Sequence, residues 1–100
     1  MKIQAFGNKQ SYEEYFISFD FVRLMESSQI TSATVVVLDP VGVDVTSTLT
    51  DESKNEISNS KINVFVRGGI SGKTYKFTCK IGTELGECYE MDATLKVLDL

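Results

Sequence analysis

The most informative stretch of the sequence is RGGISGKTYKFTCKI, from Arg67 to Ile81. It begins with closely spaced glycines and continues with alternating apolar and polar residues. Its first eight residues nearly match the phosphate-binding loop G-x-x-x-x-G-K-[ST], but arginine stands in place of the first glycine. A working loop of that kind opens a helix whose N-terminus faces the phosphates. Here YKFTCKI follows Thr74 and alternates apolar with polar residues, as in a half-buried strand. The stretch therefore predicts a corner before a strand and argues against a nucleotide site.

The residues of this corner have structural roles in the prediction. Gly68, Gly69 and Gly72 allow a steep reversal through backbone conformations that other residues avoid. Tyr75 opens the next strand three residues after Gly72, where β-sandwich domains place a tyrosine whose phenol bonds back to the connecting loop. We therefore expect these four residues to form a structural corner.

Similar short runs, rich in β-branched and aromatic residues, occupy most of the chain from Ile30 onward. The predicted strands are Ile30 to Leu38, Val43 to Thr50, Ile62 to Val66, Lys73 to Ile81 and Tyr89 to Leu98. Val43 to Thr50 alternates most clearly, and Ile57 is either the anchor of the polar connection 51–60 or part of a short edge strand.

Helix is a serious alternative only near the N-terminus. Ser11 and Glu14 have capping-box spacing, and several aromatic residues that follow fall at helical intervals. Residues 15–21 also alternate, however, and their aromatic and β-branched side chains favour a pleated surface. The preferred interpretation is a turn at residues 11–14 that leads into a strand.

These runs predict an all-β protein: a single immunoglobulin or fibronectin type III-like β-sandwich of about seven antiparallel strands. The domain spans residues 1–100, with residues 1–10 as a candidate flexible N-terminal arm. A barrel is the alternative architecture.

The last two predicted strands allow a register to be derived, because the inward face of each can be assigned separately. Pairing Ile81 with Tyr89 sets apolar residues opposite apolar residues along the hairpin and places Lys80 opposite Glu90. In this register Cys79 lies in the core and Cys88 faces outward at the loop end. We therefore expect two free thiols.

Composition limits the chemistry that is available. Ten Lys and Arg against fourteen Asp and Glu give a net charge of -4 without a basic stripe, which disfavours nucleic acid and anionic membranes as partners. The chain has no histidine, the usual general base and transition-metal ligand, and no Cys/His cluster. We expect no catalytic residues, no metal site and no cofactor, and loop carboxylates that bind calcium are the remaining alternative. We also expect synthesis in the cytoplasm, because no secretory signal or membrane-spanning run is present.

Exposed aromatic residues are the best sequence-level candidates for a protein contact. Phe65 is the first candidate, because it lies opposite the Ile62, Val64 and Val66 face of its strand, and Phe16 and Tyr12 are the others. In the alternative, both faces of the Phe65 strand are covered.

Two stretches carry a resemblance to a known family. RGGISGKTYKFTCKIGTELGECYEMDATLKV is similar to the C-terminal half of small bacteriophage and prophage proteins, which reads roughly V-x-[VF]-x-x-G-G-x-x-G-x-x-Y-x-[VF]-x-C-x-[IV]-x-T. SFDFVRLMESSQITSATVVV resembles their N-terminal half, and the resemblance covers residues 11–98. Phe21 stands where tryptophan is frequent in that family, and the connection 51–60 is longer than usual.

The resemblance implies an immunoglobulin-like virion protein of the fibre–tail adaptor or minor structural type. Such a protein is a non-enzymatic phage structural component, made in the host cytoplasm and incorporated in the virion. It docks onto tail, neck or fibre proteins, in several symmetry-related copies that can form a homo-oligomer. The competing hypothesis is a general adhesive or carbohydrate-binding sandwich, which the absence of tryptophan weakens.

Overall fold

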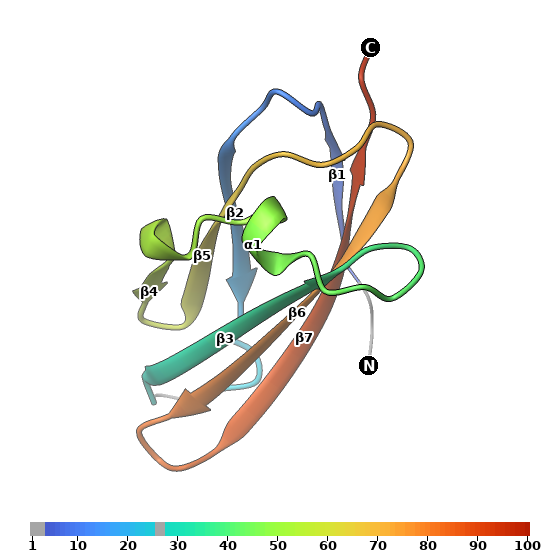
Figure 1. Cartoon of the computed structure of the whole chain (residues 1–100). Helices are drawn as coiled ribbons and strands as arrows, with labels where there is room; N and C mark the ends of the chain where they lie inside the picture. The colour runs from blue at the N-terminus through green and yellow to red at the C-terminus, as the bar shows by residue number, and fades with distance from the viewer. Residues whose placement is uncertain (1–3, 26–27) are drawn as a thin grey trace.

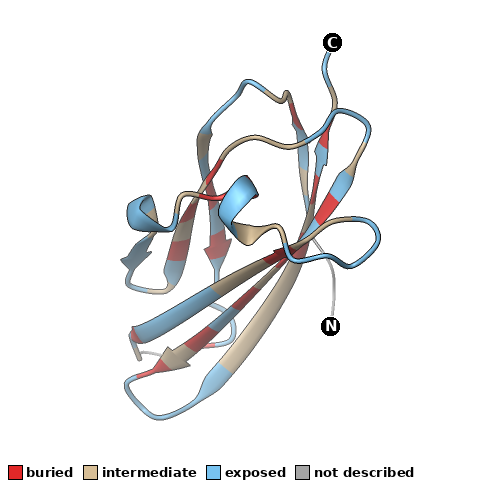
Figure 2. Ribbon diagram, viewed as in Figure 1, coloured by how far each residue is buried: buried red, intermediate tan, exposed pale blue. Residues whose placement is uncertain are grey.

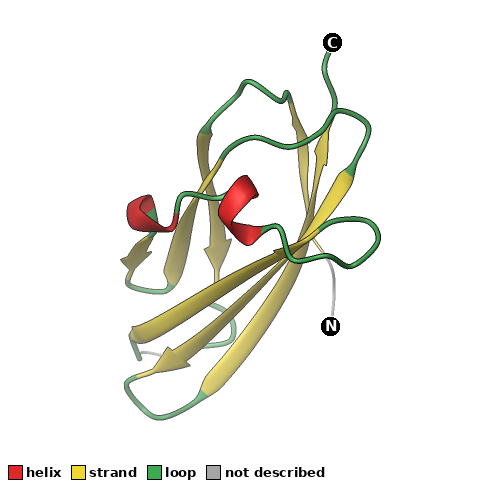
Figure 3. Cartoon of the chain, in the orientation of Figure 1, coloured by secondary structure: helices red, strands yellow, loops and turns green. Residues whose placement is uncertain are grey.

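The computed structural model describes residues 4–25 and 28–100, and this part of the chain folds into two packed sheets (Figure 1). One sheet has the strand order β1-β7-β6-β3 and the other has the order β2-β5-β4. The strands are β1 (Gln4–Lys9), β2 (Tyr15–Asp20), β3 (Ile30–Leu38), β4 (Glu56–Ser58), β5 (Lys61–Val66), β6 (Thr74–Thr83) and β7 (Cys88–Val97). Two short helical turns, α1 (Thr46–Leu49) and the 3-10 turn η1 (Glu52–Lys54), lie between β3 and β4 (Figure 3).

The core lies between the inner faces of the two sheets, where buried and exposed residues alternate along the strands (Figure 2). Along β5, Ile62, Val64 and Val66 are buried, while the residues between them face outward. Phe77 and Leu95 complete the contact from the opposite sheet, and both are fully buried. The predicted all-β sandwich is confirmed, because the period-2 pattern gives each sheet one apolar face to cover.

The strand order is that of an immunoglobulin-like sandwich, in which strands 2, 4 and 5 share one sheet and strands 3, 6 and 7 share the other. The prediction that all strands run antiparallel is wrong for β1, which pairs parallel with β7. β1 and β2 belong to different sheets, so their connection crosses the sandwich and β1 lacks the antiparallel hairpin partner that a short connection would otherwise give it. Residues 4–9, predicted as part of a flexible arm, form this strand.

The register predicted for the final hairpin is confirmed. Its pairs are Ile81 with Tyr89, Cys79 with Met91, Phe77 with Ala93 and Tyr75 with Leu95. Lys80 lies opposite Glu90, with 3.8 Å between Nζ and Oε1. Both thiols are free, with Cys79 buried and Cys88 exposed as expected.

The strand predicted from Val43 to Thr50 is wrong, because residues 46–49 form α1. Asp44 explains the change: its carboxylate accepts hydrogen bonds from the backbone N–H and the hydroxyl of Thr46, at 3.0 and 2.6 Å. Such local side-chain bonds compete with strand pairing. The alternation puts Val43, Val45 and Leu49 on one face, but only Leu49 is buried, and Val43 is 55% exposed.

Near the N-terminus, where a helix was the alternative, the chain forms a turn followed by a strand. The N–H of Glu13 bonds to the carbonyl of Gln10 at 3.0 Å and closes a turn, and β2 begins at Tyr15. Ile17 and Phe19 then point into the core, while Phe16 and Ser18 point outward.

Candidate docking surface

The predicted corner lies at one end of the sandwich, between β5 and β6. Gly68, Gly69 and Gly72 all have positive φ angles, of 63°, 100° and 94°. A Cβ atom on Gly69 would lie 2.6 Å from Cγ2 of Val97, so the close approach of the corner to β7 also requires glycine there. The phenol oxygen of Tyr75 accepts a hydrogen bond from the N–H of Ile70 at 3.0 Å, which ties the loop to the start of β6.

Lys9, at the end of β1, connects the corner to the β1–β2 connection through hydrogen bonds of its side chain. Its side chain is fully buried, and its ammonium donates to the carbonyls of Gln10, Ser11 and Gly68 at 2.8, 3.3 and 2.7 Å. Burial lowers the pKa of Lys9, and the nearby carboxylates oppose that shift. The sequence analysis missed this residue, because a lysine in a polar segment carries no local signal of burial.

The C-terminal segment secures the same connection from the other side. The carboxylate of Asp99 accepts hydrogen bonds from the backbone N–H of Ser11 at 2.7 Å and from its hydroxyl at 2.9 Å. These bonds lower the pKa of Asp99. The segment that leads into β2 is thus held from both sides.

An aromatic patch occupies the outer face of the β2-β5-β4 sheet, and it comprises Phe16, Phe65 and Lys54. The strand register sets Phe16 opposite Phe65, and their rings meet edge to face with centroids 5.1 Å apart. Lys54, from η1, places its ammonium 4.4 Å from the centroid of the Phe65 ring. Phe16 remains 46% exposed, whereas Phe65 is partly covered.

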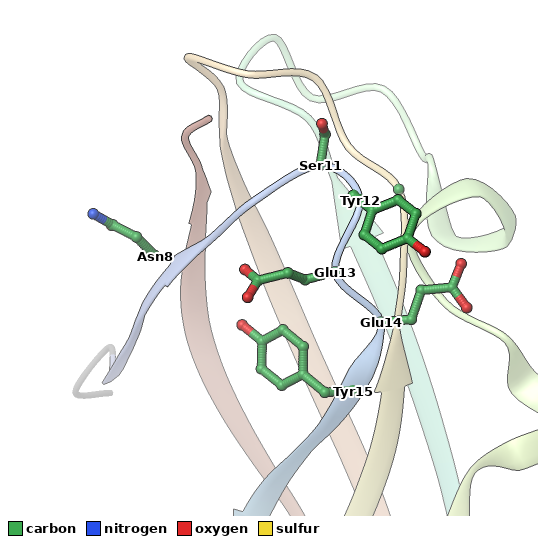
Figure 4. Close-up of a pocket in the computed structure, with 7 residues that line it drawn as sticks. Asn8, Ser11, Tyr12, Glu13, Glu14 and Tyr15 are labelled. Carbon is green, nitrogen blue, oxygen red and sulfur yellow. The ribbon is translucent and has the colours of Figure 1, made fainter. Parts of the chain in front are cut away.

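Tyr12, the third predicted contact residue, is 94% exposed and takes no part in the ring contact between Phe16 and Phe65. It lines an open hollow of about 930 Å³ beside the β1–β2 connection, which we call the β1–β2 hollow. The lining residues are Asn8, Ser11, Tyr12, Glu13, Glu14, Tyr15 and Gly68 (Figure 4). Figure 4 shows Glu13 and Tyr15 on one side of the chain and Tyr12 and Glu14 on the other.

The charged groups that line this hollow are the carboxylates of Glu13 and Glu14. One oxygen of Glu13 accepts the N–H of Gln10 at 2.7 Å. The pKa of Tyr15 is raised, first by burial and then by the Glu13 carboxylate. The hollow therefore combines negative charge with two phenol side chains.

Metal sites, thiols and membrane spans are the remaining candidate features of the described residues. Residues 4–25 and 28–100 hold no group of three or more Cys, Asp or Glu side chains placed to bind a metal ion. Burial raises the pKa of Cys79 to about 12, which keeps that thiol protonated at neutral pH. Among the helices described, none has the length and apolar character to cross a membrane.

Fold and surface together define an all-β module of the immunoglobulin type that carries an exposed aromatic patch on one sheet. The particular family is shown by sequence comparison: the model of the family Gp77, described as podophage GP4 fiber-tail adaptor protein gp77, matches residues 9–96. The chain belongs to this family and is a phage structural protein. No curated protein matches the chain.

Proposed function

We propose that this protein is a non-enzymatic adaptor of the virion that docks onto tail or fibre proteins through its aromatic patch. The family match over residues 9–96 is the observation that carries the proposal, since that family is described as fiber-tail adaptors. In the assembled particle the protein acts in several copies, and its partners are proteins rather than nucleic acid or membrane. The net charge of -4 supports that choice of partner.

The aromatic patch supports the choice of docking surface. Phe16 projects from a strand on a firmly packed sheet, and its neighbours Ile17 and Phe19 are buried. An aromatic ring held in this way loses little conformational freedom when a partner covers it, and such residues dominate many protein interfaces. Lys54 beside the ring of Phe65 adds a charge that a partner can pair.

The proposal is tested by complementing a phage that lacks this gene with Phe16→Ser, Phe65→Ser or both. We expect at least a tenfold loss of the variant protein and of fibres from purified particles, measured by quantitative mass spectrometry. Leu85→Ser is the matched control, because Leu85 is 69% exposed in the distant β6–β7 turn. Melting curves of the isolated variants show whether each one remains folded.

Normal fibre content in particles assembled with the folded double variant would refute the proposed surface. Absence of the protein from wild-type particles would refute the proposed function as a whole. Specific binding of the isolated domain to glycans would favour the competing carbohydrate-binding hypothesis.

A further inference from the structure

The two sheets leave four edges, formed by β1 and β3 in one sheet and by β2 and β4 in the other. Exposed edges tend to pair with other chains, so proteins commonly shorten, bend or cover them. β1 is bent by an irregularity between Ala5 and Asn8, and β4 has only 3 residues. β3 has an irregularity near its start, and the carbonyl of Val37 near its end is bonded to the N–H of Val45 at 2.8 Å.

β2 carries none of these protections within the described structure. It has 6 residues, and its pairing with β5 continues without a register shift from Tyr15 to Asp20. No proline lies in this strand, and no described strand pairs with its other side (Figure 1). Its free edge is therefore the most regular of the four.

The hydrogen bonds of the neighbouring strand show which backbone groups this edge presents. The N–H and carbonyl of Phe65 bond to Asn55 and Asp51, on the side away from β2. Two directly opposite residues of an antiparallel pair either bond to each other through both backbone groups or direct both groups away from each other. Phe16 is opposite Phe65, so its N–H and carbonyl point away from β5. Ser18 and Asp20 follow the same alternation, and all three residues are exposed.

The surroundings of the edge indicate the chemistry of its occupant. The aromatic patch adjoins the edge on the outer face, at Phe16, and the β1–β2 hollow lies at its start, at Tyr15. Glu13, Glu14 and Asp20 place carboxylates at both ends of the strand. Among the described residues, three lysines lie near this region. Lys9 is buried and bonded to backbone carbonyls, Lys54 lies over the Phe65 ring, and Lys61 is set opposite Asp20 in the β2–β5 register. The carboxylates of Glu13 and Glu14 at the start of the strand are therefore the ones most available to a partner.

We propose that an extended, basic segment of a partner protein adds to the free edge of β2 as a fourth strand of this three-stranded sheet. The inference rests on the proposed adaptor function and specifies how the partner is held. The backbone N–H and carbonyl groups of Phe16, Ser18 and Asp20 form the hydrogen bonds to the added strand. Alternate side chains of the added strand contact Phe16 on the outer face and Tyr15 beside the hollow.

Charge favours a foreign segment over a second copy of this chain. Pairing β2 with itself would bring two sets of the Glu13, Glu14 and Asp20 carboxylates together, on chains that each carry a net charge of -4. Like charges set close together across paired strands are destabilising. Lysine or arginine in the added strand would instead neutralise these carboxylates.

Ser18→Pro is the discriminating variant. It removes an N–H that points outward and leaves the bonds between β2 and β5 in place, and proline is tolerated at such positions of edge strands. Ser18→Ala is the matched control, because both changes remove the hydrogen bond between the Ser18 hydroxyl and Asn63, at 2.6 Å. Only proline also removes the backbone donor.

The probes are overlapping 15-residue peptides that cover the tail and fibre proteins of the same phage. We expect a lysine- or arginine-containing peptide to bind wild type and Ser18→Ala within twofold of each other, and Ser18→Pro at least tenfold more weakly. Amide exchange by NMR supplies a measurement without mutation. The N–H groups of Phe16, Ser18 and Asp20 should exchange rapidly in the free protein and become protected when the peptide binds.

Unprotected amides in the complex would overturn strand addition, even if Ser18→Pro fails to fold. Binding of the intact tail or fibre protein without binding of any peptide would also overturn it. A homodimer of the free chain that Ser18→Pro dissociates would show that a second copy occupies the edge and would refute the foreign segment. If particles need Phe16 and Phe65 but Ser18→Pro assembles normally, the adaptor function stands and strand addition fails.

Discussion

Replacement of Lys9 by methionine should destabilise the domain by about 3 kcal/mol. The change keeps a long apolar side chain but removes the donor that three backbone carbonyls share, at 2.7, 2.8 and 3.3 Å from Nζ. Hydrogen bonds to a charged group contribute roughly 1.5–3 kcal/mol each, and an unsatisfied buried acceptor costs about 1–3 kcal/mol. Removal of the ammonium also removes its own desolvation cost, which is several kcal/mol, so the net loss is smaller than the sum of the bonds.

The assay is thermal and urea unfolding of Lys9→Met beside wild type. For a domain of this size, about 3 kcal/mol corresponds to a fall in Tm of roughly 12–24 °C. Lys96→Met is the control, since Lys96 lies on the neighbouring strand β7 with an exposed side chain, and it should change stability by less than about 0.5 kcal/mol. A Lys9→Met protein as stable as the control would refute the assigned role of the buried ammonium.

The pH dependence gives a second check on Lys9. Its pKa in the folded state is lowered from 10.5, chiefly by burial, so the unfolded chain binds more protons than the folded one as the pH approaches 10.5. Stability therefore rises with pH in that window because of this residue. The difference in unfolding free energy between wild type and Lys9→Met should widen between pH 8 and pH 10.5, and a difference that narrows would contradict the burial of the ammonium.

Three further predictions concern the corner and the thiols. Tyr75→Phe leaves the loop N–H that bonds the phenol without its acceptor and should cost about 1–3 kcal/mol in urea unfolding, so an unchanged midpoint would argue against the corner. Gly69→Ala combines a φ of 100° with a contact of 2.6 Å and should cost about 2–4 kcal/mol, clearly more than Gly86→Ala, where φ is also positive but the space is open. Cys88 should react with a thiol reagent in the native protein at neutral pH while Cys79 reacts only after unfolding, and two fast-reacting thiols in the native state would contradict the burial of Cys79.

The candidate surface was partly predictable. Phe16 and Phe65 each stand out as aromatic residues on the polar side of an alternating strand, which is a local property of the sequence. Their contact depends on the register between β2 and β5, which are far apart in the chain. Tyr12 was correctly expected to be exposed, but only the structure shows that it lines the β1–β2 hollow.

The sequence by itself determined the two-sheet fold and the register of its final hairpin. Alternation has a period of two, so a register shift by one residue would turn a whole strand to the wrong face, and the apolar residues of β6 and β7 permit one alignment across a short turn. The glycines and Tyr75 likewise define the corner through local backbone requirements.

Tertiary structure alone decided the parallel placement of β1, the burial of Lys9 and the free edge of β2. The helical turn at residues 46–49 was also not predicted, because local bonds of Asp44 compete there with strand pairing. The alternation at Val43 to Thr50 resembles that of the true strands, but in the described structure its strand pairing is limited to single bridges at Asp44 and Thr50, and the side chain of Asp44 bonds to Thr46 between them. A pattern within one segment specifies which face is apolar. The pattern does not specify which other segment pairs with that strand, or whether any segment does. That depends on contacts between residues far apart in the chain.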